Sequence, residues 1–217
     1  MKVSLNDLVS ILSDRAGMPF NVPLQEELKV IINYKRADWV QKILDKHPEQ
    51  RKFYYKDIVD SLIKVDKSEC PIEVECEVLR TTNKIPVPIR TKDTLFDYVG
   101  DPDKHDAYTY TTPDQLPWIV KYSKYTSARP KYFYTNGYIY IYNEEDLEYI
   151  GIRGLWPDQR QLNLFKCNGA NCYTDDDQYD VPDDIINTIV QDVLKNELRL
   201  LAPEAGEVTI NKNEQNN

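Results

Sequence analysis

The 217-residue chain has few of the residues that build disulfide frameworks, phosphate-binding loops and membrane spans. It contains four cysteines, seven glycines and two histidines. Four cysteines do not make a disulfide framework in a chain of this size, which favours free thiols in a reducing compartment. No apolar run reaches the length of a membrane span, and the N-terminus lacks a basic and then apolar signal segment. We therefore expect no membrane partner.

Basic charge is also in short supply. The chain has 27 lysines and arginines against 36 aspartates and glutamates, which gives a net charge of −9. An acidic surface of this kind keeps a protein soluble and argues against coating nucleic acid with the whole exterior. A local basic strip remains compatible with this balance.

The residues that carry catalysis or bind metals lack the spacing that either role needs. No glycine-rich phosphate loop is present, and neither His47 nor His105 has a matching nucleophile motif. Asp175–Asp184 is acidic but lacks the spacing of a calcium loop. The five residues between Cys70 and Cys76 exceed the usual zinc spacing, and Cys76 falls on the apolar side of a predicted strand. We predict a protein that is not an enzyme and holds no metal or cofactor.

What the sequence does contain is tyrosine: eleven of its sixteen tyrosines lie between Tyr98 and Tyr149. The segment 131–142 places aromatic and β-branched residues on both sides of Asn136-Gly137, the strongest short-range signal for a two-residue hairpin. Alternation in its second half predicts that the isoleucines face the core. The tyrosines would then form a wet contact face, which suits a protein–protein surface.

Apolar periodicity predicts helices at both ends of the chain and a β section between them. Three helices are expected within 1–66, the third of them from Gln50 to Lys64, followed by a β section over 70–156. A long closing helix over 183–202 presents a wide apolar stripe toward the N-terminal helices. The predicted fold class is α+β: a helical bundle with a small antiparallel β section inserted. It forms a single domain over 1–202, followed by a polar extended tail at 203–217.

One strip of the chain has an alternative interpretation. No acidic residue occurs from Gln115 to Asn143, while basic residues alternate there with aromatic ones. Charges for phosphate and rings for stacking are what a single-strand-binding groove uses. The alternative function is therefore a nucleic-acid-binding module over 118–142. Its candidate contacts are Lys121, Lys124, Arg129 and Lys131. The simpler interpretation is a β layer with packed aromatics and solvated lysines, which the acidic remainder of the chain favours.

Several features in order resemble one family. They are Gly154-Leu-Trp-Pro-Asp158, the cysteines Cys167 and Cys172, and Tyr179-Asp-Val-Pro-Asp-Asp184 leading into a helix and a polar tail. Together with the preceding Tyr-rich hairpin, they resemble the head–tail connector, or ring adaptor, proteins of tailed bacteriophages. The likeness is greatest to those of crAss-like phages with short tails.

The resemblance implies a structural virion protein at the head–tail junction, made in the cytoplasm of the host bacterium. It implies self-association into a ring, twelve-fold in related connectors, that joins the portal protein to the next connector or tail protein. Genomic DNA would pass through the lumen without sequence-specific contact, and the resemblance carries over no catalytic residues. The candidate contacts for assembly are Trp118, Tyr132, Tyr134, Tyr138, Tyr140, Tyr142, Trp156, Glu204, Glu207, Val208 and Ile210.

Overall fold

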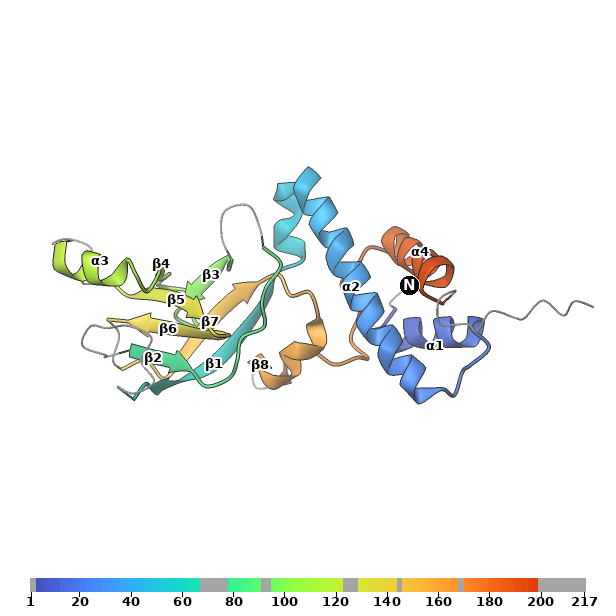
Figure 1. Cartoon of the computed structure of the whole chain (residues 1–217), viewed down its shortest axis with the longest axis horizontal. Coiled ribbons are helices and arrows are strands. Elements are labelled where there is room, and N and C mark those ends of the chain that lie inside the picture. The colour runs from blue at the N-terminus through green and yellow to red at the C-terminus, as the bar shows by residue number, and fades with distance from the viewer. Residues whose placement is uncertain are drawn as a thin grey trace, which may run out of the picture.

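A mixed β-sheet forms the larger part of the computed structural model, and a group of helices lies beside it (Figure 1). The structure describes residues 3–66, 78–90, 95–122, 129–143, 146–167 and 170–198. The strands are β1 (Lys56–Lys64), β2 (Val78–Thr81), β3 (Tyr98–Gly100), β4 (Thr109–Tyr110), β5 (Lys131–Thr135), β6 (Tyr138–Tyr142), β7 (Tyr149–Gly154), β8 (Lys166–Cys167) and β9 (Ala170–Asn171). The α-helices are α1 (Leu5–Arg15), α2 (Val22–Lys46), α3 (Leu116–Tyr122) and α4 (Asp183–Asp192). They are joined by the 3₁₀ helices η1 (Pro48–Phe53) and η3 (Gln159–Leu164) and the π-helical turn η4 (Val193–Glu197).

The sheet curves until its two edges nearly meet. Its strands follow the order β3–β7–β1–β2–β6–β5–β4, with β8 beside β1 and β9 beside β8. Only the β4–β5 pair is parallel among the described pairs. The residues just before β4 return to β3, where Gly100 bridges Ala107 and the Tyr108 amide donates to the Val99 carbonyl over 2.8 Å. The sheet is thus a near-closed barrel that leaves few exposed edge groups.

Gly100 is what allows this closure. A Cβ atom at this position would lie 2.0 Å from the Asp106 carbonyl oxygen and 2.7 Å from the Tyr98 hydroxyl. The same hydroxyl lies within hydrogen-bonding distance of the Asp101 carbonyl, at 2.8 Å, and of the Asp106 carbonyl, at 2.9 Å. Close approach of two backbones at a sheet edge therefore requires a residue without a side chain here.

The interior of the barrel is apolar and rich in aromatic rings. One side chain in two along each strand points inward, because successive residues of a strand face opposite sides of the sheet. The inward set comprises Ile58, Leu79, Ile85, Phe96, Val99, Tyr132, Ile139, Ile141, Ile150, Ile152, Trp156, Leu162, Phe165 and Tyr173. These residues come from most strands of the sheet and from η3, so the barrel has one continuous core.

The hairpin predicted at Asn136-Gly137 is confirmed. Asn136 has φ 52° and Gly137 has φ 84°, the left-handed pair that a tight two-residue hairpin turn requires. β5 and β6 pair from Thr135↔Tyr138 to Lys131↔Tyr142. The register keeps Ile139 inside the barrel, as the alternation predicted.

The helical lobe is built from α1, α2 and α4. Ser4 and Asp7 form a capping box, which starts α1 with two reciprocal hydrogen bonds. The helices share a core made of Leu5, Leu8, Val9, Leu12, Leu24, Leu28, Ile32, Tyr179, Val181, Ile186, Ile189, Val190, Val193 and Leu198. Lys35 of α2 pairs with Asp192 and with Glu197, each at 2.9 Å, and so ties α2 to the end of α4.

Buried polar contacts join the two lobes along α2. Arg36, only 1% exposed, donates from Nη1 to the Trp156 carbonyl at 2.9 Å, and its guanidinium lies 5.9 Å from the centre of the Tyr179 ring. The Tyr179 hydroxyl donates to Asn33 Oδ1 at 3.0 Å. Lys56 at the start of β1 pairs with Asp180 at 2.6 Å. The segment between the barrel and α4 is thereby fixed against α2.

The predicted fold class, a helical bundle with a small antiparallel β section, is wrong. The near-barrel sheet is the main body of the molecule, where we predicted a helical bundle carrying a small β insertion. The closing helix is short: α4 ends at Asp192, and its last turn widens into η4. The tail 203–217 and the start of the predicted β section, residues 70–77, lie outside the described residues.

The largest local error concerns the third predicted helix, from Gln50 to Lys64. The structure has one 3₁₀ helix there, η1, followed by β1, which pairs with β7 from Lys56 to Ser61 and with β2 from Leu62 to Lys64. The apolar residues of this segment fit helical spacing and also include the β-branched residues that strands favour. Two partner strands decided between these conformations, and both come later in the chain.

Candidate assembly surfaces

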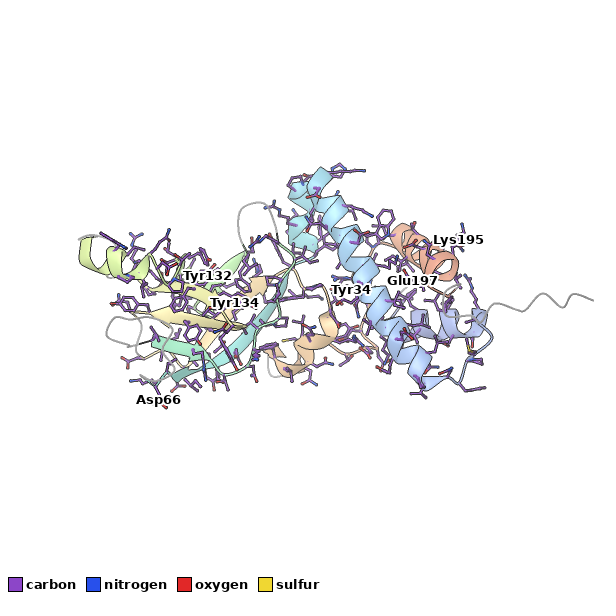
Figure 2. All side chains as sticks on the ribbon, viewed as in Figure 1. Tyr34, Asp66, Tyr132, Tyr134, Lys195 and Glu197 are labelled. Atoms are coloured by element: carbon purple, nitrogen blue, oxygen red, sulfur yellow. The ribbon has the colours of Figure 1, made fainter. Side chains whose placement is uncertain are left out.

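Two of the predicted contact residues belong to the core of a single subunit, and a third packs partly buried against it. Tyr132 and Trp156 are 5% and 1% exposed, and with Tyr134 they surround Phe96 inside the barrel. The Tyr134 hydroxyl donates to the Ile85 carbonyl at 2.9 Å. Burial raises the pKa of Tyr132 to about 12, so this ring stays neutral. Figure 2 places both tyrosines within the sheet. These residues stabilise the fold and are not available to a partner.

The tyrosines of β6 form a covered outer face, not the wet face that we predicted. Tyr140 is 4% exposed and stacks on Phe133 with ring centres 5.0 Å apart. Leu116 of α3 belongs to the same cluster, against which Tyr138 and Tyr142 pack partly buried. Both faces of the hairpin are thus buried over most of its length, and only its ends reach solvent.

Trp118 is the one aromatic candidate that the structure leaves largely exposed, at 66%. It lies on α3, the short helix at the far end of the barrel (Figure 1). Leu116 of the same helix is fully buried and anchors it to the sheet. Trp118 therefore remains a candidate contact. The four tail candidates, Glu204, Glu207, Val208 and Ile210, lie outside the described residues.

The basic strip does not form a continuous groove among the described residues. Lys131 is 4% exposed and donates from Nζ to the Arg129 carbonyl at 3.1 Å. Burial, with a smaller contribution from Arg129, lowers the pKa of Lys131. Arg129 is exposed, whereas Lys124 and the side chain of Lys121 lie outside the described part. A buried lysine cannot meet a phosphate, which weakens the nucleic-acid interpretation of 118–142.

Exposed apolar side chains mark surfaces that the sequence analysis missed. On the helical lobe, the exposed fractions are 93% for Phe20, 63% for Val22, 71% for Tyr34 and 70% for Phe53. On the barrel, Val87, Tyr110 and Tyr149 are more than half exposed. In the sequence, Phe20 could have indicated such a surface, because it lies between two predicted helices and outside the apolar stripe of either one.

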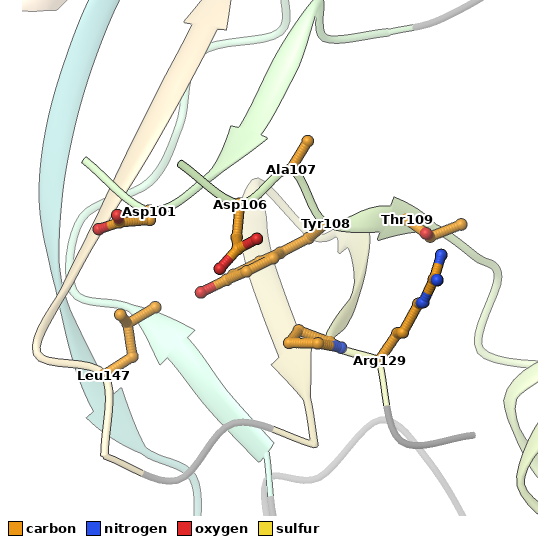
Figure 3. A pocket seen from close by; sticks show the side chains of 8 residues that line it. Asp101, Asp106, Ala107, Tyr108, Thr109, Arg129 and Leu147 are labelled. Carbon is orange, nitrogen blue, oxygen red and sulfur yellow. The ribbon is translucent and has the colours of Figure 1, made fainter. Parts of the chain in front are cut away.

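Two hollows are lined by residues that the structure describes. The larger, about 700 Å³, is lined by Asp101, Asp106, Ala107, Tyr108, Thr109, Arg129, Pro130 and Leu147. Figure 3 shows the Tyr108 ring between Asp106 and Leu147, with Arg129 at the opposite end from Asp101. The smaller, about 430 Å³, is lined by Gln50, Phe53, Tyr54, Gln178, Tyr179, Asp180, Val181 and Pro182. It lies where η1 meets the segment leading into α4.

The cysteine prediction is wrong for Cys172, which is disulfide-bonded and not a free thiol. Within the described ranges, no group of three or more histidine, cysteine, aspartate or glutamate residues is placed to hold a metal ion. No described helix is long and apolar enough to cross a membrane.

Comparison with protein families identifies the chain. A family model described as phage tail ring protein 2 (CrAss_Ring_2) matches residues 24–217. The chain belongs to this family. The match confirms the resemblance to ring proteins of crAss-like phages, and it covers both lobes from α2 onward. No protein of curated function matches the chain.

Membership in this family makes the chain a phage tail ring protein, a structural component of the virion that associates with copies of itself and with tail components. A ring protein needs contact surfaces on two sides of each subunit, because every copy meets one neighbour on either side. The exposed apolar residues of the helical lobe and of the barrel are therefore the surfaces to consider, in preference to the buried hairpin.

Proposed function

We propose that this ring protein closes into a ring that joins the portal to the tail, with genomic DNA passing through the lumen. The observation that carries the proposal is the family match, which spans residues 24–217 and so includes both lobes. The twelve-fold symmetry of related connectors suggests twelve copies. The ring would lie between the portal protein and the next connector or tail protein, and the protein would be made in the host cytoplasm before assembly.

The charge of the chain is consistent with a DNA conduit. A net charge of −9 on each subunit gives a ring an acidic surface, which would repel the phosphate backbone and allow DNA to slide. The proposed role is structural and not catalytic. This role requires only that the lumen bind DNA weakly.

The mass of the purified protein, measured by light scattering, tests the proposal. With a 25.4 kDa chain, a ring of twelve copies has a mass of about 300 kDa, and a ring that forms only on the portal adds about that mass to the portal. A protein that stays monomeric both alone and with the portal would contradict the proposal. The matched variant is truncated after Ala202 and so lacks the tail 203–217, which holds four of the candidate contacts. We expect this variant to keep the ring and to lose binding to the portal.

A further inference from the structure

Phe20 is an unusually exposed aromatic side chain, and the local sequence explains why. Asn21 caps α2 by accepting from the Leu24 amide at 3.1 Å, so Phe20 occupies the position just before the cap. A hydrophobic residue there normally packs against the fourth residue of the helix. That residue is Gln25, whose Nε2 instead donates to the Pro19 carbonyl at 2.7 Å. Phe20 therefore has no staple partner and is 93% exposed.

The smaller hollow offers the kind of environment that such a ring needs. Its floor contains Tyr54, Tyr179 and Val181, each no more than 9% exposed, and Phe53 lies at its rim. Its walls are fixed by the hydrogen bond from Tyr179 to Asn33 and the ion pair of Asp180 with Lys56. A preformed, largely apolar hollow of about 430 Å³ lies within the range of natural binding pockets.

The protruding ring and the hollow lie at different positions along one helix, α2. Phe20 precedes the start of α2, whereas Gln50 and Phe53 follow its end. Tyr179, which lines the hollow, bonds to Asn33 of α2, 13 residues after Phe20, or about 20 Å along the helix at 1.5 Å per residue. Figure 1 shows α2 as one continuous helix between these ends. The ring of Phe20 therefore cannot reach the hollow of its own chain.

We propose that Phe20 of one copy inserts into the hollow between η1 and residues 178–182 of the next copy. A protruding apolar group and a complementary hollow elsewhere on the same molecule make a head-to-tail contact, which generates rings when the rotation closes. Interface hot spots are enriched in side chains that fill well-packed, desolvated pockets, aromatic residues among them. Val22, 63% exposed beside Phe20, would cover the rim. This inference depends on the ring assembly proposed above and names its contact.

Mutation of either partner tests the contact. Phe20→Ala should raise the concentration needed for half-assembly about 30-fold or more, as expected for a hot-spot aromatic residue. Gln50→Trp, which fills the hollow from its rim, should do the same. Each variant alone should stay monomeric where the wild type assembles. An equal mixture should form only dimers. In each dimer, Phe20 of the Gln50→Trp variant inserts into the intact hollow of the Phe20→Ala variant, and no second contact can form. Leu164→Ala, 71% exposed on η3, is the control and should assemble normally.

A photo-crosslinking phenylalanine analogue at position 20 identifies what the ring touches. We expect crosslinks to residues 48–54 or 178–182 of another copy. This inference would be overturned if Phe20→Ala assembled as well as the wild type. It would also be overturned if the crosslinks mapped to other residues or to the portal. Either outcome would leave the proposed ring intact. A wild type that never assembles, with or without the portal, would overturn both.

Discussion

At the scale of single residues, Gly100 controls whether the barrel closes. Replacing it with alanine places a methyl group against the Asp106 carbonyl, a backbone atom that cannot rotate away. We expect the free energy of unfolding to fall by about 3 kcal/mol, the upper end of the usual cost of overpacking. Denaturant titration followed by near-ultraviolet circular dichroism of the tyrosines measures this loss.

Gly17 provides the control for that substitution. It has φ 72°, and an added Cβ would meet no atom within 4 Å. Gly17→Ala should therefore cost only the strain of the left-handed conformation, about 1–2 kcal/mol. Equal losses for the two variants would mean that the approach between β3 and Ala107 does not hold the barrel shut.

At the scale of secondary-structure elements, local patterns predicted what local forces determine. The Asn136-Gly137 hairpin depends on neighbours in the sequence, and this prediction is confirmed. The capping box at Ser4 likewise joins residues only three apart in the chain. The segment 50–64 depended on β7, whose residues come later in the chain, so its local pattern left helix and strand nearly equivalent. The tyrosine face of β6 was predicted to be solvent-exposed, because no local sequence pattern indicates that Leu116 of α3 packs against it.

The pairing of β1 with β7 is reinforced by charge. Asp57 lies opposite Arg153 and accepts from Arg153 Nε at 2.8 Å and from Lys104 Nζ at 2.7 Å. Burial by itself would raise the pKa of Asp57, but the hydrogen bonds from Arg153 and Lys104 outweigh it, so the pKa lies below its ordinary value. The group therefore stabilises the fold above the pKa of an unfolded aspartate, roughly 3.9. That stability is lost as the pH falls through the lower, folded pKa.

This linkage predicts a pH effect with a definite sign. In acid titrations of the free energy of unfolding, Asp57→Asn should be less stable than the wild type at neutral pH. The difference should shrink as the pH falls below 3.9. The exposed fraction of Asp57, 45%, keeps the effect modest because solvent screens the pair. Asp103→Asn, an exposed aspartate on the neighbouring loop, is the control and should leave the wild-type pH profile unchanged. If the difference in free energy of unfolding between the wild type and Asp57→Asn stayed constant across the acid range, the lowered pKa of Asp57 would be contradicted.

At the scale of the whole molecule, the surfaces relevant to a ring arise where distant segments meet. The smaller hollow joins η1 to residues 178–182, and the larger one joins residues 101–109 to Arg129 and Leu147. No sequence pattern links such segments, so the candidate contacts chosen from sequence favoured aromatic residues that prove to be core. The family, by contrast, could be predicted, because its motifs can be recognised in the sequence without knowing how their residues pack.

Arg36 joins α2 to Trp156, just after β7, and we predict it to be the most costly polar residue to replace in α2. Arg36→Met keeps most of the buried volume but leaves the Trp156 carbonyl without its charged donor. We expect the free energy of unfolding to fall by about 1.5–3 kcal/mol, the usual worth of a hydrogen bond to a charged group. Arg15→Met, at an exposed position of α1, should change it by no more than about 0.5 kcal/mol.

The same variant links the junction to assembly. If Arg36 holds the hollow beside Tyr179 at a fixed angle to the barrel, folded Arg36→Met subunits should form rings in lower yield than Arg15→Met subunits at equal concentration. Light scattering at a temperature where both variants remain folded measures the yield. Because a ring repeats one angle at every contact, a small spread in that angle prevents closure and favours open or irregular oligomers. Rings of normal yield from Arg36→Met would mean that neighbouring copies, and not the buried arginine, set the angle.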